Sequence, residues 1–325
     1  MKNISISEEF IAALEAKIPK KSELADLIAD TLIIEKESAY RRLRGDVHFS
    51  LQEAILLSKK LNISLDKLTD IAPLKSRPFY LKLTNYAKPQ DIDIEMIKEW
   101  NYVLREVADD PTVKFGGTAK MFPDMFHLGF ENIERFYFFK WLYQYGDNSH
   151  GVKYKDVKVS PKIIDLLAEM NYLLQQIKSV FYIFDNNVFK NFIQDVCYFS
   201  ELELIDSEDI KLIANDLMNL IDHMEELASQ GGNKYGSKID IYITNVDFET
   251  GTIYIDSDKY KLVFIRCFTL HDIASLDSYT LETVKQWMQS LKRSSLQISE
   301  CAEIQRKKFF NEQRKYVNKL TNNDC

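Results

Sequence analysis

Paired cysteines, long apolar runs and an excess of basic residues are all missing from this chain of 325 residues. The cysteines Cys197, Cys267, Cys301 and Cys325 are widely separated and form no C-x-x-C pair, so we expect neither a disulfide framework nor a zinc site. No stretch approaches the ~18 apolar residues of a membrane span, and the chain starts without a charged and then apolar leader. A cytoplasmic protein without a membrane partner is therefore expected.

The net charge of -7 excludes a general electrostatic attraction to nucleic acid. Any contact with DNA must come from a local basic patch, and nonspecific affinity should be modest. Hydrophobic residues make up 46% of the chain and charged residues 28%, as in an ordinary folded globular protein. The length allows two or three domains with a substantial core.

Motifs for catalysis are also missing. Residues 116–120 (GGTAK) lack the spacing of a phosphate-binding loop, so a plain turn is expected there, and no Gly-x-Ser-x-Gly elbow is present. His271–Asp272 could be an acid/base pair, but it follows a predicted strand and could equally cap the next segment. The histidines show no metal-ligand spacing; they are His48, His127, His150, His223 and His271. The sequence therefore predicts no enzyme, no cofactor and no metal.

The most informative stretch is a short basic helix expected over residues 36–44 and ended by Gly45. Ala39 and Leu43 are four positions apart, so they share the face that packs inward. Arg41, Arg42 and Arg44 crowd the remaining surface, where like charges repel and stabilise a fold poorly. Arginines so arranged are well suited to phosphates and guanine edges.

Helix signals flank this segment on both sides. Before it, Pro19 ends a helix over residues 5–18, and a second helix with Ser22 as N-cap carries an apolar stripe. After it, residues 50–53 have the spacing of a capping box. The helix that follows is expected to be buried through Leu51, Ala54, Ile55, Leu57 and Leu61. A last short helix is predicted over residues 64–68.

The first ~70 residues resemble the five-helix Cro/repressor-type (Xre-like) helix-turn-helix domain, and the segment 39–45 is most similar to a BetR-like variant. The matching positions are Ile28, Ala29, Leu32, Ile34, Ser38, Ala39, Gly45, Phe49, Ser50, Leu51, Leu61, Ile63, Ser64 and Leu65. The resemblance implies that the helix over residues 36–44 enters the major groove of DNA. Ile33 replaces a frequent glycine, which suggests a turn without a positive φ angle. Arg42 replaces an aromatic residue and is expected to be exposed near a phosphate.

The expected DNA contacts are Lys36, Glu37, Ser38, Tyr40, Arg41, Arg42, Arg44 and His48. Of these, Arg44 is expected nearer a phosphate, and His48 could contact a phosphate or be an ordinary loop residue. The alternative is a charged helix on a helical bundle that binds no DNA, because most charge runs are only solvated surfaces. The ordered helix signals on both sides favour DNA binding.

Two domains are predicted, a helix-turn-helix domain over residues 1–72 and a sensor or dimerisation region over residues 73–325, joined near a proline-containing linker at 70–80. In the second, helices are expected over 91–108, 130–145, 160–178, 188–199 and 207–228, with a possible strand at 79–83. The aromatic helix at 130–145 could line an apolar cavity, form core or meet another subunit. The apolar run at 180–184 fits a buried strand or a helix.

Alternation of isoleucines with polar residues predicts an antiparallel three-stranded meander over residues 239–268. From Ser278 a helix is expected to continue to about Leu320, with near-heptad apolar positions at Leu281, Val284, Met288, Leu291 and Ile298. This stripe could meet a second copy or pack on the meander. The expected fold is thus mostly α, with an α+β C-terminal region that holds a short meander and a long terminal helix.

The sequence predicts a dimeric transcriptional regulator that binds double-stranded DNA, with a C-terminal region for dimerisation and an unidentified small-molecule or protein effector. The alternatives are an enzyme or a protein-interaction scaffold with an appended helix-turn-helix domain. An enzyme would contain a polar convergent pocket, a sensor an apolar pocket, and a scaffold an exposed apolar surface.

Overall fold

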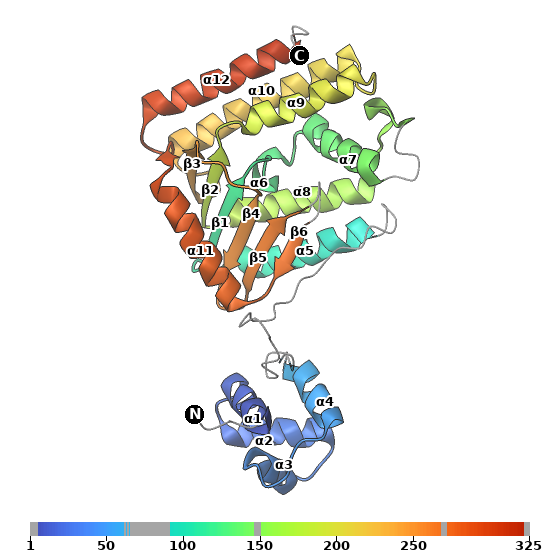
Figure 1. Cartoon of the computed structure of the whole chain (residues 1–325), viewed down its shortest axis with the longest axis vertical. Coiled ribbons are helices and arrows are strands. Elements are labelled where there is room, and N and C mark those ends of the chain that lie inside the picture. Colours follow the sequence, from blue (N-terminus) through green and yellow to red (C-terminus); the bar gives the residue numbers. More distant parts are fainter. Residues whose placement is uncertain are drawn as a thin grey trace. The chain divides into compact units, whose positions relative to one another are not determined.

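A computed structural model describes residues 6–61, 63, 65, 92–145, 151–267 and 272–321. The chain divides into two compact units, Met1–Phe79 and Tyr80–Cys325 (Figure 1). Four predictions fall wholly or mostly outside the described residues: the domain boundary after residue 72, the linker at 70–80, the strand at 79–83 and the helix at 64–68.

The described part of the N-terminal unit contains four helices: α1 (Ile6–Lys17), α2 (Lys21–Leu32), α3 (Lys36–Leu43) and α4 (Leu51–Leu61). Ala39 and Leu43 face inward as predicted. They join a core made of Phe10, Leu14, Leu24, Ala25, Ile28, Ala39, Leu43 and Leu57. The helix α2 begins two residues earlier than expected, with Lys20 rather than Ser22 at its N-cap position.

The predicted capping box at the start of α4 is confirmed. The backbone N–H of Glu53 donates to Ser50 Oγ at 3.3 Å, and the N–H of Ser50 donates to Glu53 Oε2 at 2.8 Å. The predicted burial of α4 is wrong at Leu51, which is 74% exposed, and at Ile55, which is also exposed. The inner face is instead set by Leu57, with partly buried Ala54 and Leu61 at helical spacing on either side of it.

The C-terminal unit is built on a seven-stranded mixed sheet in the order β6-β5-β4-β1-β2-β3-β7. The strands are β1 (Lys114–Ala119), β2 (Ser179–Asp185), β3 (Lys238–Thr244), β4 (Thr252–Asp256), β5 (Lys261–Arg266), β6 (Asp272–Ser275) and β7 (Leu296–Gln297). Strands β1, β2 and β3 are parallel, and the other neighbouring pairs are antiparallel.

This sheet corrects the expected fold class, a mostly α protein with a short meander. The strand β3 pairs with β2 and β7 and has no pairing with β4, which instead lies beside β1. The residues Gly116 and Gly117, expected in a turn, lie in the middle of β1 at the centre of the sheet. Alternating polarity identifies a strand but carries no information about its partner, which explains the error.

Both faces of the sheet are covered, and this explains the continuous apolar run at 180–184. Tyr182 and its alternate neighbours Val180 and Phe184 pack into the main core, whereas Phe181 and Ile183 pack into a second cluster on the opposite face. A strand buried on both faces needs no polar alternation. The run is therefore the strand β2, which resolves the ambiguity with a helix.

The second cluster lies under the helix α11 (Ser278–Arg293), which packs on β4 and β5 (Figure 1). The remaining helices are α5 (Ile92–Ala108), the short α6 (Asp124–His127), α7 (Glu131–Tyr145), α8 (Pro161–Gln176), α9 (Val188–Glu201), α10 (Ser207–Gln230) and α12 (Glu303–Thr321), with a 3-10 turn at Tyr154–Asp156. The aromatic residues of α7 are core: Phe136 and Phe139 are fully buried. Their rings contact Phe199 of α9.

The prediction of a single long terminal helix is also wrong. The chain leaves the helix after Arg293, adds the short strand β7, and starts α12 only at Glu303. Glu300 and Ala302 have positive φ angles in this break. Of the proposed dimer stripe, Leu281, Met288 and Leu291 are buried on the inner face of α11, Val284 packs against their cluster, and Ile298 belongs to the main core. These apolar side chains therefore pack within their own unit, and the reason for assigning dimerisation to this segment is lost.

The structure also bears on the cysteines, on membrane-spanning helices and on metal ligands. Cys197 is disulfide-bonded, so the expectation of unpaired cysteines is wrong at that position, whereas Cys267 and Cys301 are free and exposed. Across the described ranges, no helix combines the length and apolarity needed to cross a membrane. Within those ranges, no three His, Cys, Asp or Glu side chains are grouped to hold a metal ion.

Candidate nucleic-acid interface and C-terminal pocket

The helices α2 and α3 are joined by a three-residue turn, Ile33 to Glu35. Ile33 adopts the left-handed conformation, with φ 54° and ψ 53°. In this geometry the N–H of Ile33 and the N–H of Ile34 both donate to the carbonyl of Ala29, which closes the end of α2. The expected turn without a positive φ angle is therefore wrong: the backbone keeps the glycine-type turn although the residue is isoleucine.

Replacing Ile33 by glycine is expected to stabilise the N-terminal unit by about 0.5–1 kcal/mol. A left-handed conformation costs a non-glycine residue about 1–2 kcal/mol, and part of this gain is offset by the greater freedom of glycine in the unfolded chain. The Ile33 side chain is 92% exposed, so its removal sacrifices little packing. Amide hydrogen exchange of the full chain, followed in peptides from α2 and α3, measures the change.

The control for Ile33→Gly is Asp30→Gly, which places glycine at an exposed interior position of α2. That variant should exchange faster, because glycine destabilises a helix interior by about 1 kcal/mol. Faster exchange in Ile33→Gly than in the wild type would contradict strain at this turn.

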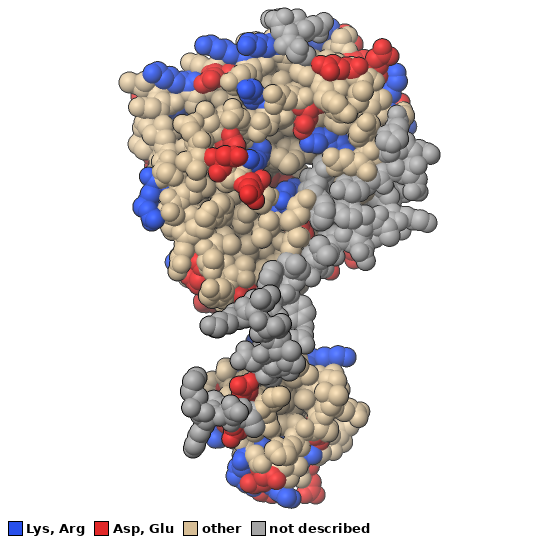
Figure 2. Space-filling model, viewed as in Figure 1, with Lys and Arg blue, Asp and Glu red and all other residues tan. Residues whose placement is uncertain are grey.

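The outer face of α3 presents an exposed surface opposite the buried Ala39 and Leu43. Glu37, Arg41 and Arg44 recur at helical spacing and are exposed, as is Lys36 at the start of the helix. Tyr40 is half-buried against the N-terminal core, and Ser38 is also half-buried. Figure 2 shows acidic and basic side chains mixed over this end of the unit. On α3, four of the expected contact residues are thus exposed.

The exposed cations of α3 differ in the ion pairs that they form with neighbouring carboxylates. Arg44 donates to Glu37 at 3.1 Å and to Asp46 at 2.9 Å, and these hydrogen bonds raise its pKa. Lys36 pairs with Asp26, which raises its pKa. Arg41 forms no ion pair with any residue of the described ranges. Its guanidinium is therefore the one best able to take a new partner.

Arg42 contradicts the expected exposure. Its side chain is only 16% exposed and pairs with Glu53 at 2.8 Å. A further nitrogen donates to the carbonyl of Ser38 at 3.3 Å. Burial would raise the pKa of Glu53, but bonds from the Ser50 N–H and from Arg42 lower it. Arg42 thus ties the end of α3 to the capping box of α4 and holds the two helices together.

His48 lies in the exposed loop between α3 and α4, and its Nδ1 is 3.2 Å from Ser7 Oγ at the start of α1. Its ring is thereby held beside the N-terminal helix. A phosphate contact by His48 stays a prediction.

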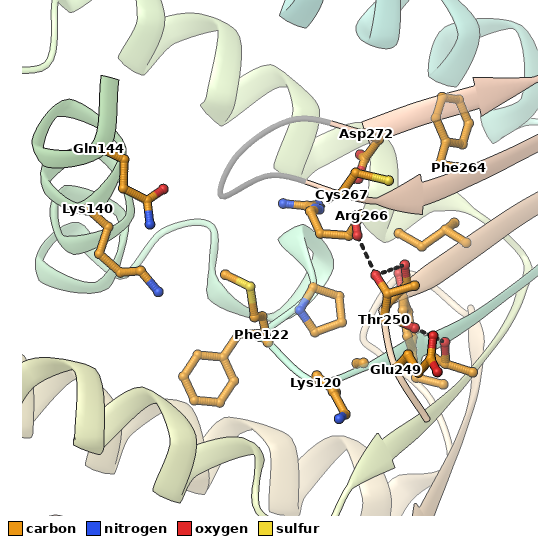
Figure 3. A pocket seen from close by; sticks show the side chains of 17 residues that line it. Lys120, Phe122, Lys140, Gln144, Glu249, Thr250, Phe264, Arg266, Cys267 and Asp272 are labelled. Carbon is orange, nitrogen blue, oxygen red and sulfur yellow. Dashed lines mark hydrogen bonds and ion pairs between the residues drawn. The ribbon is translucent and has the colours of Figure 1, made fainter. Parts of the chain in front are cut away.

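A separate cavity of about 510 Å³ lies in the C-terminal unit (Figure 3). The strand β1 ends where the antiparallel strand β4 begins, and the end of β5 and the start of β6 lie at the same edge of the sheet. Residues 118–123, 249–251, 266–267 and 272 line the cavity from these four strand ends. Crevices at the carboxyl ends of parallel strands are common ligand sites.

The wall of this pocket combines cations with apolar side chains. Lys120 follows β1, Lys140 belongs to α7, and Arg266 ends β5. Lys140 pairs with Asp195 at 2.5 Å and Arg266 with Asp272 at 2.7 Å, while Lys120 pairs with Asp247. The apolar and aromatic part of the wall consists of Ala119, Met121, Phe122, Pro123, Tyr182, Ile253 and Phe264. The pocket thus combines the polar side chains expected of an enzyme with the apolar side chains expected of a sensor.

Two buried polar rings lie beside the pocket. His127 Nδ1 is 3.1 Å from the carbonyl of Pro123, and burial lowers the pKa of its ring. Tyr137 accepts the backbone N–H of Phe122 at 3.2 Å, and burial raises its pKa. Both rings are therefore neutral near pH 7 and support the segment after β1.

Sequence reasoning did not find the pocket, because its residues come from five separate parts of the chain. One signal was present: Lys140 interrupts the aromatic sequence of α7, and a lysine in a buried helix needs a polar or charged partner. Comparison of the chain with protein-family models, curated proteins and solved structures gives no match.

Proposed function

We propose that the protein is a sequence-specific transcriptional regulator that binds double-stranded DNA through α3. One observation carries the proposal: α3 follows α2 across a tight three-residue turn, packs inward through Ala39 and Leu43, and turns Glu37, Arg41 and Arg44 outward. In the helix-turn-helix proteins that the first ~70 residues resemble, the second helix of such a pair lies in the major groove.

The charge distribution supports specific rather than general binding. Residues 36–44 hold four basic side chains and one acidic one, whereas the whole chain has a net charge of -7. A local patch on an acidic protein gives weak nonspecific affinity, so discrimination rests on base contacts. Arg41 is suited to the O6 and N7 atoms of guanine, and Arg44 to a phosphate.

The protein is proposed to act as a homodimer, because one short helix reads only a few base pairs. Two copies of the N-terminal unit related by a two-fold axis would bind half-sites about one turn of the DNA helix apart. The terminal segment that suggested dimerisation is buried core, so a truncation at Asp277 would remove part of that core and could not test assembly.

The test of this function is selection of bound sequences from a random double-stranded DNA library by the full-length protein, followed by competition. A recovered consensus that competes at least ~10³-fold better than random DNA is expected. A two-fold symmetric consensus supports the dimer. Recovery of no consensus by a protein shown to be folded would overturn the proposed function.

A further inference from the structure

The pocket of the C-terminal unit has no part in the proposed DNA contact. We propose that it is a binding site for a small amphiphilic organic carboxylate, whose anionic end lies between Lys140 on one side and Arg266 on the other and whose apolar body packs on Met121, Phe122, Ile253 and Phe264. The volume of about 510 Å³ lies within the range of small-molecule sites.

The charges of the wall select an anion. Lys120, Lys140 and Arg266 line the cavity, against two carboxylates, Glu249 and Asp272. The carboxylates that pair with the two lysines, Asp247 and Asp195, lie outside the lining and are themselves exposed. An entering anion can therefore approach these ammonium groups while their present partners return to water at little cost.

Lys140 is the most informative of the three cations. Its side chain is only 15% exposed, although it belongs to a helix whose other inward residues are apolar and mostly aromatic. Figure 3 shows its amine directed from α7 toward the segment after β1, on the side of the pocket opposite Arg266. A lysine held in this way presents its charge to the cavity as well as to Asp195.

Arg266 supplies the second anchor. Burial alone would lower its pKa, but attraction by Asp272 and Asp124 raises it, so the guanidinium is charged at all ordinary pH values. The ion pair with Asp272 is made through Nε, and Figure 3 shows the terminal nitrogens turned toward the cavity. The planar edge of a guanidinium matches a carboxylate in a two-point contact.

The apolar wall defines the rest of the ligand. Phe122 is itself fixed by ring contacts to Phe189 and Phe192, and Phe264 by Trp100 at 4.6 Å between centroids. These preformed surfaces favour a compact aromatic or aliphatic body over a strongly hydrated one. Inorganic phosphate and other small hydrophilic anions would leave this surface uncovered.

The test uses the full-length protein, with two carboxylates, 3-phenylpropionate and octanoate, and their uncharged primary amides as probes. Binding is measured by ligand-observed NMR titration and calorimetry. At least one carboxylate is expected to bind roughly tenfold or more tightly than its amide, because a charge-assisted hydrogen bond is lost in the amide. In Lys140→Gln this preference should fall to about one.

A matched control and a second variant make the test decisive. Lys162→Gln removes one exposed lysine from α8 outside the pocket and should leave the preference unchanged. Arg266→Gln combined with Asp272→Asn removes the partly buried pair without leaving a lone charge and should also abolish the preference. Equal binding of acids and amides, binding unaffected by Lys140→Gln, or no binding by the folded chain would each overturn the proposal. None of these readouts involves DNA, so the result is independent of the proposed regulatory function.

Discussion

Replacing Arg41 and Arg44 together by alanine is expected to remove specific DNA binding. Loss of a guanidinium from a base edge weakens binding by ~1–3 kcal/mol, which is roughly 5- to 150-fold. Arg41 is exposed and without an ion pair among the described residues, so no internal partner has to be broken before it binds. Arg44 shares its charge with Glu37 and Asp46, so its contribution should be smaller and uniform across sequences.

The two single variants separate base reading from phosphate contact. Arg41→Ala should reduce discrimination between the selected site and a site with one changed base pair. Arg44→Ala should weaken binding to both sites equally. It should also reduce the magnitude of the slope of log K against log salt concentration by about one for each bound N-terminal unit. Fluorescence anisotropy with labelled duplexes at several salt concentrations gives both quantities.

A charge-matched control is available in the same unit. Lys59 and Lys60 are exposed at the end of α4, and their replacement by alanine removes the same two charges away from α3. This control should bind the selected site within a few-fold of the wild type. Wild-type affinity in the folded Arg41/Arg44 double variant would refute α3 as the reading helix.

Replacing Gly116 by alanine is expected to destabilise the C-terminal unit by about 1–3 kcal/mol, the usual cost of overpacking a core. A Cβ atom there would lie 2.6 Å from Tyr254 Cε1 and against the ring of Phe181, and real Cβ atoms do not approach so closely. Both rings are buried, so neither can move aside cheaply. Urea unfolding followed by tryptophan fluorescence reports on this unit, since Trp100, Trp141 and Trp287 all belong to it.

The control substitution is Gly151→Ala. No atom lies within 4 Å of a Cβ built at Gly151, and its φ angle is not in the left-handed range. The stability should therefore change little or rise slightly. Combining Gly116→Ala with Phe181→Leu should cost less than the sum of the two single changes, because the smaller side chain makes room. An unchanged unfolding midpoint in Gly116→Ala would show that the rings are not closely packed on β1.

The N-terminal unit was largely predictable because its signals are local. The capping box at Ser50 and Glu53, and the inward pair Ala39 and Leu43, depend on residues three or four positions apart. The errors arose where the burial of a side chain depends on a residue that is distant in the sequence. Arg42 is largely buried and pairs with Glu53, eleven positions along the chain, and no local pattern reveals that pairing.

In the C-terminal unit, strands were easier to recognise than their partners. The glycines of β1 resemble a turn when read alone, yet they are needed because the rings of Phe181, Tyr182 and Tyr254 from neighbouring strands cover them. Similarly, the pocket exists only because four strand ends meet at one edge. Such features depend on pairing over long separations, about which composition and periodicity say nothing.

The pairing of β1 also affects how the protein is made. Lys114 lies opposite Asp256, so 142 positions separate partners in adjacent strands, whereas the four N-terminal helices contact each other within 61 residues. At ordinary rates of synthesis, roughly 7–27 s pass between the emergence of β1 and that of β4. During this interval one side of β1 has no strand beside it, and exposed strand edges are sites of aggregation. A chain interrupted before residue 250 should therefore carry a folded N-terminal unit attached to an insoluble remainder.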